Sequence, residues 1–167
     1  QRSMLRCTLD RVVRLIPPER VLVVVSTDHR RDVETELAHW PRQNIIYQPI
    51  NRDTAPGILL PLAHITNRDP AASVLVFPSD HFILEEDRFM DHVALAARAV
   101  SHRPSTIALL AMEADAPEVE YGYIVPRSEP DQITLWGTRS AARFVEKPNA
   151  ILAQEIVKAG GLWNTMI

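Results

Sequence analysis

Apolar residues recur along this chain with two different spacings. Where they recur every three to four positions they predict helices, which end at breakers such as Pro17-Pro18. Such segments lie at 3–16, at 56–66 and around 89–100. Another follows an N-cap at Thr27 and buries Val33, Leu37 and Trp40, and a last one at 150–159 is capped by Asn149 and ended by Gly160-Gly161. Short, mostly apolar or β-branched runs predict strands at 21–25, 44–47, 73–77, 106–111, 121–126, 132–136 and 139–147.

The order of these elements predicts an α/β fold. Strands and helices alternate as far as the run 106–111, and the region 121–147 is then rich in strands. This order is typical of a Rossmann-like, mostly parallel sheet flanked by helices, with a strand-rich insertion. We predict one domain over 1–167, and both ends look cut, so we expect this domain to be a truncated part of a longer polypeptide.

Composition excludes several classes of protein. The hydrophobic content of 46% and charged content of 23% are ordinary for a globular domain. A net charge of -3 argues against a non-specific nucleic-acid binder. No apolar run reaches the roughly 20 residues of a membrane span, and Cys7 is the only cysteine, which excludes an internal disulfide. A cytoplasmic location is the expectation.

Asp80 is the first candidate for chemistry. It follows the predicted strand 73–77, and open α/β sheets bind ligands beyond the carboxyl ends of their strands. A carboxylate there suits Mg²⁺, which usually takes one or two protein carboxylates and completes its shell with phosphate and water. The same side chain could cap the following turn, and position alone favours neither interpretation.

The loop Gln48–Pro56 is the second candidate, because it leads from a strand into the N-terminus of a helix. Unpaired N–H groups at that end attract anions or carbonyl oxygens, and the amide of Gln48 can read the edge of a base. A plain turn with an N-cap from Asp53 or Thr54 is the ordinary alternative, and for this loop taken alone it is favoured.

The third candidate is the strand end Phe144-Val145-Glu146-Lys147-Pro148. A carboxylate beside an ammonium can hold the hydroxyls of a sugar with one group and its phosphate with the other. A solvated ion pair at an ordinary strand end is the alternative. Gly122, between two tyrosines, marks either a bulge or the close approach of a ligand. Asn164 could bond a sugar hydroxyl or the local backbone.

Taken together, these residues resemble the sugar-1-phosphate nucleotidylyltransferases, and within that family the branch that makes GDP-mannose. The likeness covers essentially the whole chain. Each motif alone is weakly specific, and their occurrence in family order is the strong signal. The motifs are Arg52-Asp53-Thr54-Ala55-Pro56, Pro78-Ser79-Asp80-His81, Tyr121-Gly122-Tyr123-Ile124, Phe144-Val145-Glu146-Lys147-Pro148 and Trp163-Asn164.

The resemblance implies a role for each matching residue on the nucleotide side. Gln48 and the backbone of Thr54 and Ala55 would face the base of GTP. Asp80 would bind the catalytic Mg²⁺. Gln48 and Asp53 stand where the family more often has Glu and Asn, which leaves the choice of base less strictly specified.

On the sugar side, the resemblance implies that the backbone N–H of Gly122 donates to the sugar. Glu146 would hold sugar hydroxyls, Lys147 the sugar phosphate, and Asn164 a further hydroxyl. The ending Thr165-Met166-Ile167 departs from the usual Ser-Gly-Met, which weakens the case for mannose.

The implied reaction is Mg²⁺-dependent transfer of a nucleotidyl group from GTP to mannose 1-phosphate, giving GDP-mannose and pyrophosphate. Mg²⁺ on Asp80 and the ammonium of Lys147 would offset the repulsion between phosphates. The family's glycine-rich loop for the triphosphate and a second metal-binding aspartate do not occur within 1–167. We therefore expect the isolated chain to be inactive and its parent to be the enzyme.

Two alternatives remain open at this stage. Another hexose-1-phosphate nucleotidylyltransferase, using UTP or dTTP, would carry similar motifs. A non-catalytic, regulatory module that binds a nucleotide sugar would keep the sugar side and lack the triphosphate loop. The sequence also leaves the oligomeric state open, a homo-oligomer included.

Overall fold

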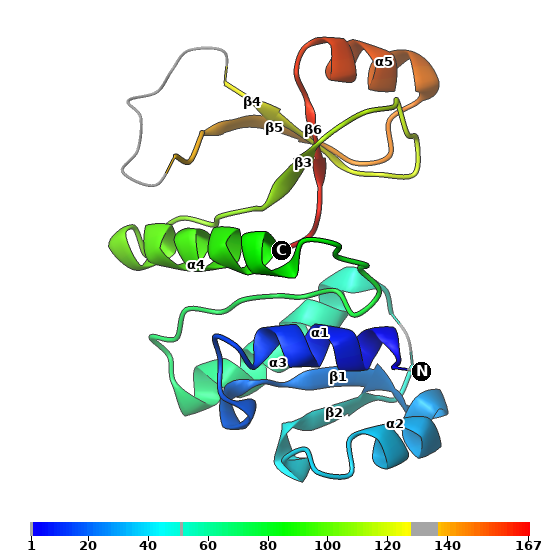
Figure 1. The fold of residues 1–167 in the computed structure, drawn as a ribbon, viewed down its shortest axis with the longest axis vertical. Coiled ribbons are helices and arrows are strands. Elements are labelled where there is room, and N and C mark those ends of the chain that lie inside the picture. The colour runs from blue at the N-terminus through cyan, green and yellow to red at the C-terminus, as the bar shows by residue number, and fades with distance from the viewer. Residues whose placement is uncertain (1, 51, 128–136) are drawn as a thin grey trace. The chain divides into compact units, whose positions relative to one another are not determined.

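The strands lie in two separate sheets, one parallel and one antiparallel (Figure 1). The structure, a computed structural model, describes residues 2–50, 52–127 and 137–167. The chain divides into two units, Gln1–Glu86 with the parallel sheet and Asp87–Ile167 with the antiparallel sheet. Parallel strands with helices and a strand-rich later region are thus confirmed, whereas a single domain over 1–167 stays a prediction. The predicted strand 132–136 lies outside the described residues.

The first unit alternates helices and strands as the sequence predicts. Its strands β1 and β2 pair in parallel, with Val23 opposite Ile45 and Ser26 opposite Gln48. Its elements in chain order are α1 (Met4–Val12), η1 (Pro18–Arg20), β1 (Val23–Ser26), η2 (Thr27–His29), α2 (Arg30–Glu36), η3 (Arg42–Asn44), β2 (Ile45–Gln48) and α3 (Thr54–Arg68).

The core of the first unit forms where α1 and α2 pack against β1. Leu9 from α1, Val23 from β1, and Val33 and Leu37 from the second helical segment are buried together. The spacing of Val33 and Leu37 therefore predicts the buried side of this segment correctly. Trp40 packs against the same cluster but lies beyond the end of α2 at Glu36.

A buried asparagine ties the strands of this unit to its turns. Asn44 is 1% exposed, and its amide nitrogen donates to the carbonyls of Pro18 at 3.0 Å and Glu19 at 2.9 Å. Its amide oxygen accepts from Nη1 of Arg68 at the end of α3, at 3.1 Å. Because Asn44 immediately precedes β2, this network fixes where β2 starts and hence where Gln48 ends it.

The second unit is an antiparallel sheet with two helices. The strand order is β3-β6-β4-β5, and Tyr123 of β4 lies opposite Val145 of β5 and Trp163 of β6. The elements are α4 (Glu86–His102, whose first residue belongs to the first unit), β3 (Ala111–Glu113), β4 (Tyr123–Pro126), β5 (Ala141–Val145), α5 (Ala150–Lys158) and β6 (Leu162–Asn164).

The ends of α5 follow the predicted capping chemistry. The side chain of Asn149 accepts from the N–H of Leu152 at 2.9 Å, as an N-cap does. At the other end, Gly160 has φ 78, its N–H donates to Val157, and the N–H of Gly161 donates to Ile156. This pair of bonds is a Schellman motif, whose left-handed residue is usually glycine.

Several predicted elements were wrong or too long. Residues 73–77 belong to neither sheet, because an apolar run forms a strand only where a neighbouring strand completes its ladder. The strand predicted at 106–111 starts only at Ala111. Thr27 does not cap α2; Ser26 instead accepts from the N–H of Asp28 and starts η2. The short strand β6 was not predicted.

Replacing Asn44 with alanine tests the tie between β2 and its turns. Two carbonyls and a guanidinium would lose their buried partner, so we expect the free energy of unfolding to fall by about 1–3 kcal/mol. Chemical denaturation measures it, and the neighbouring exposed side chain in Gln43→Ala is the matched control. Equal midpoints for the two variants would contradict this assignment.

Candidate functional site

The predicted nucleotide loop joins the end of β2 to the start of α3. Gln48 is the last residue of β2 and is half-buried. Its side-chain nitrogen lies over Gly57, where a Cβ would come within 3.7 Å of Nε2. The structure therefore places the amide of Gln48 beside Gly57, in the first turn of α3.

The N-terminus of α3 presents backbone donors. Thr54 and Ala55 are its first residues and are exposed, and the first bond of the helix runs from the N–H of Gly57 to the carbonyl of Asp53 at 3.3 Å. The N–H groups of Thr54 and Ala55 precede that bond, so they have no acceptor within the helix. Pro56 has no N–H and suits this first turn.

Asp53 holds the N-cap position with an unusual backbone. Its φ of 63 and ψ of -167 lie in a region that non-glycine residues rarely adopt, and such strain is often found at ligand sites. Its side chain makes no capping hydrogen bond to α3, so the capping alternative does not hold for Asp53. The loop is also tied to η2, because the hydroxyl of Thr27 donates to the carbonyl of Pro49 at 3.3 Å.

Asp80 is exposed on a turn that follows the irregular segment 73–77. Within the residues that the structure describes, no group of three or more His, Cys, Asp or Glu side chains could hold a metal ion. A metal enclosed by protein ligands alone therefore does not fit here. An Mg²⁺ held by one carboxylate and by substrate phosphates does fit an exposed Asp80.

A buried arginine reaches the backbone beside Asp80. Arg11 of α1 is 4% exposed, and its Nη2 donates to the carbonyl of His81 at 3.2 Å. Arg11 was not among the predicted site residues, because an arginine on an amphipathic helix usually belongs to the solvated face. Its position next to Thr8 and Leu9, which are buried, is the signal that could have found it.

In the second unit, Glu146 lies directly against Gly122. A Cβ on Gly122 would come within 2.6 Å of Oε2 of Glu146 and 3.0 Å of Cζ of Phe144. The glycine therefore allows the carboxylate to approach the backbone of the 121–123 segment. The group that approaches Gly122 in the structure is a side chain of the protein itself, and the close approach of a ligand stays a prediction.

Lys147 follows Glu146 with a left-handed backbone. Its φ is 41, and its N–H donates to the carbonyl of Tyr121 at 3.2 Å. Its Nζ lies 3.8 Å from Oε2 of Glu120, in an ion pair whose side chains are 59% and 76% exposed. The solvated ion pair of Lys147 is therefore formed with Glu120 and not with the predicted Glu146, which lies against Gly122.

Asn164 completes this group. Its N–H donates to the carbonyl of Gly122 at 2.8 Å, and its side-chain oxygen accepts from the N–H of Met166 at 3.1 Å. The local-backbone role predicted as an alternative is therefore observed for the oxygen. The structure brings together all of the predicted sugar-side residues: Gly122, Glu146, Lys147 and Asn164.

The sequence model of the nucleotidyl transferase family matches residues 1–167, and so spans both units. The chain belongs to this family. It is 34% identical over 168 residues to the alginate biosynthesis protein AlgA of Pseudomonas syringae pv. tomato, covering 99% of this chain and 34% of that protein. It is 31% identical over 173 residues to the mannose-1-phosphate guanylyltransferase of Escherichia coli K12, covering 98% of this chain and 34% of that protein.

Solved structures support the same assignment. A structure named mannose-1-phosphate geranyltransferase, from Thermus thermophilus, matches with a TM-score of 0.83 and 28% identity, over 98% of this chain and 45% of that chain. The predicted α/β nucleotidyltransferase fold is therefore confirmed. This nucleotidyl transferase chain spans about a third of the length of the curated relatives described above.

Two glycines of this nucleotidyl transferase chain test the packing of its candidate sites. In Gly57→Ala the new Cβ meets Nε2 of Gln48 at an ordinary 3.7 Å inside α3, so we expect a gain of about 0.5–1 kcal/mol in stability. In Gly122→Ala the Cβ displaces Glu146 and crowds Phe144, so we expect a loss of about 1–3 kcal/mol. Changes of the same sign in guanidinium denaturation would contradict this packing.

Proposed function

We propose that the protein containing this chain transfers a guanylyl group from GTP to mannose 1-phosphate, with GDP-mannose and pyrophosphate as products. The main support is the arrangement in the second unit, where the carboxylate of Glu146 lies against Gly122 and the next residue, Lys147, carries an exposed ammonium. A carboxylate accepts from sugar hydroxyls and an ammonium attracts phosphate, so this group suits a sugar phosphate. The Escherichia coli relative bears the name of this activity.

For the nucleotide, we assign the loop between β2 and α3. The N–H groups of Thr54 and Ala55 offer donors to carbonyl oxygens of a base, and the amide of Gln48 offers both a donor and an acceptor. Guanine presents an acceptor at O6 and a donor at its ring N–H, and it matches such a set. Because Gln48 stands where the family more often has Glu, UTP and dTTP remain alternatives to GTP.

The ion pair of Lys147 is compatible with binding phosphate. Exposed pairs such as Lys147 with Glu120 contribute only about 0–1 kcal/mol, since water screens both groups. Hydrogen bonds between an ammonium and a phosphate are charge-assisted and stronger. The lysine can therefore exchange Glu120 for the sugar phosphate at little cost.

In the proposed reaction, an oxygen of the sugar phosphate forms a bond to the α-phosphorus of GTP. The bond from that phosphorus to the oxygen bridging to the β-phosphate breaks, and pyrophosphate leaves with the electron pair. Mg²⁺, when bound, would supply positive charge to the phosphates. Asp80 would hold it by one carboxylate, and Lys147 would hold the phosphate of the acceptor.

None of the helices in the described part of the chain combines the length and the apolar character that a membrane span requires. A location in the cytoplasm remains a proposal, as does a homo-oligomeric state. The alternative to an enzyme is a regulatory module that binds a nucleotide sugar without catalysis. The following assay distinguishes the enzyme from this module.

The decisive assay measures pyrophosphate release by the natural protein that contains this chain. We expect release with GTP and mannose 1-phosphate, and much slower release when UTP or dTTP, or glucose 1-phosphate, replaces one substrate. Release only with another pair would reassign the substrates within the family. Binding of GDP-mannose without release for any pair would overturn the enzyme proposal in favour of the regulatory module.

Asp80→Asn in the same protein tests the metal assignment. The amide keeps the shape but loses the charge, so we expect kcat to fall by about a hundredfold or more, because the lost charge stabilisation is worth several kcal/mol and each 1.36 kcal/mol is tenfold. Asp91→Asn, exposed on α4, is the control. Normal turnover with Asp80→Asn would remove Asp80 from the metal site.

A further inference from the structure

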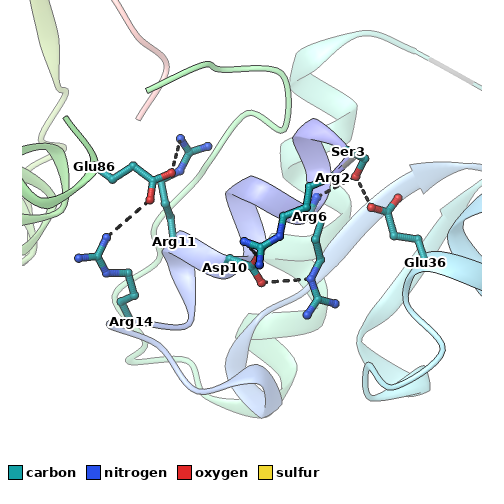
Figure 2. A network of polar contacts seen from close by, with 8 residues as sticks. All are labelled: Arg2, Ser3, Arg6, Asp10, Arg11, Arg14, Glu36 and Glu86. Carbon is teal, nitrogen blue, oxygen red and sulfur yellow. Dashed lines mark hydrogen bonds and ion pairs between the residues drawn. The ribbon is translucent and has the colours of Figure 1, made fainter. Parts of the chain in front are cut away.

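The guanidinium of Arg11 is buried in the first unit, and its partners come from three segments of the chain. Nη2 donates to Oγ1 of Thr8 at 3.0 Å and to the carbonyl of His81 at 3.2 Å. Nη1 lies 3.6 Å from Oε1 of Glu86, the first residue of α4 (Figure 2). Thr8 is itself only 5% exposed.

Because the guanidinium of Arg11 is buried, the stability of the fold depends on these contacts. A charge removed from water is stable only if it is paired and hydrogen-bonded, and its partners lose their own bonds if it is absent. Arg14, one turn further along, pairs with the other oxygen of Glu86 at 3.8 Å, but its side chain is 42% exposed (Figure 2). Water can replace most of what Arg14 provides, and it cannot reach Arg11 in the same way.

The bond to His81 determines what Arg11 can control. His81 directly follows Asp80, and residues 73–77 before this turn have no strand ladder to hold them. The turn is therefore held on its C-terminal side, where Arg11 bonds the carbonyl of His81 and pairs with Glu86, five residues after His81. An arginine suits this task, because its planar fork bonds several acceptors at fixed angles.

We propose that Arg11 is a positioning residue for the divalent cation, acting by holding the 78–81 turn so that the carboxylate of Asp80 is in place before the cation arrives. This inference rests on the proposed function of Asp80. Arg11 itself would touch neither the cation nor the substrates. Its removal should therefore weaken the cation's binding more than it slows the reaction once the cation is bound.

The kinetic test uses the natural protein that contains this chain, with the variants Arg11→Met, Arg11→Lys and Arg14→Met. Pyrophosphate release is measured against free Mg²⁺ with both substrates saturating. For Arg11→Met we expect the Mg²⁺ concentration at half-maximal rate to rise by about 10–100-fold, as for loss of a group that orients a metal ligand. The maximal rate should stay within about threefold, and Arg14→Met should behave like the wild type.

A second readout does not depend on catalysis. Hydrogen exchange of backbone amides, followed by mass spectrometry without metal or substrate, reports on the turn itself. We expect faster exchange over 78–84 in Arg11→Met, with 23–26 and 45–48 unchanged, and no such change in Arg14→Met. If the wild type releases no pyrophosphate from any substrate pair, the proposed function fails, and this experiment still decides whether Arg11 orders the turn.

Two results would overturn the proposal. One is an unchanged Mg²⁺ requirement in Arg11→Met with a reduced maximal rate, because this would place Arg11 in another role. The other is unchanged exchange over 78–84. If Arg11→Met does not fold, Arg11→Lys carries the test, because a lysine cannot bond all of the acceptors at once. For Arg11→Lys, an Mg²⁺ concentration at half-maximal rate about threefold above that of the wild type supports the proposal. An unchanged Mg²⁺ concentration together with unchanged hydrogen exchange over 78–84 contradicts it.

Discussion

Buried polar groups must find partners, and this constraint places the functional loops of the chain. Asn44 satisfies it by bonding two turns and the end of α3, which sets the start of β2 and so the place of Gln48. Arg11 satisfies it by bonding the turn beside Asp80. In the second unit, the buried Tyr123 donates its hydroxyl to the carbonyl of Glu118 at 2.8 Å. That bond fixes the approach of the chain to Gly122.

The second unit adds a steric constraint to this polar one. The absence of a side chain at Gly122 lets Glu146 lie against the backbone, and the carbonyl of Gly122 accepts from Asn164. The rings of Tyr121 and Trp163 form a T-shaped pair, with centroids 5.2 Å apart and an interplanar angle of 85°. The candidate sugar-binding group is thus built from the ends of β4, β5 and β6, where hydrogen bonds of the sheet limit its freedom.

Local sequence patterns predicted many of the helices and their buried sides. The spacing of Val33 and Leu37, the N-cap Asn149 and the end of α5 at Gly160 all depend on a few neighbouring residues, and all are confirmed. Strand predictions failed where pairing decides the outcome: 73–77 has no ladder, and β6 has only three residues. The position of Arg11 on α1 hinted at burial, but its role could not be predicted, because its partners His81 and Glu86 are distant in sequence. The motif residues were found through resemblance, and the structure adds that Gly122, Glu146, Lys147 and Asn164 lie together.

In the proposed function the two units have separate recognition tasks: the first binds the nucleotide and the second binds the sugar phosphate. Amide chemical shifts of the isotope-labelled natural protein test it most directly, in separate titrations with GTP and with mannose 1-phosphate. We expect saturable shifts at Gln48, Thr54 and Ala55 with GTP, and at Gly122, Lys147 and Asn164 with mannose 1-phosphate. Shifts from mannose 1-phosphate at Thr54 and Ala55 with none at Gly122 and Lys147 would contradict it.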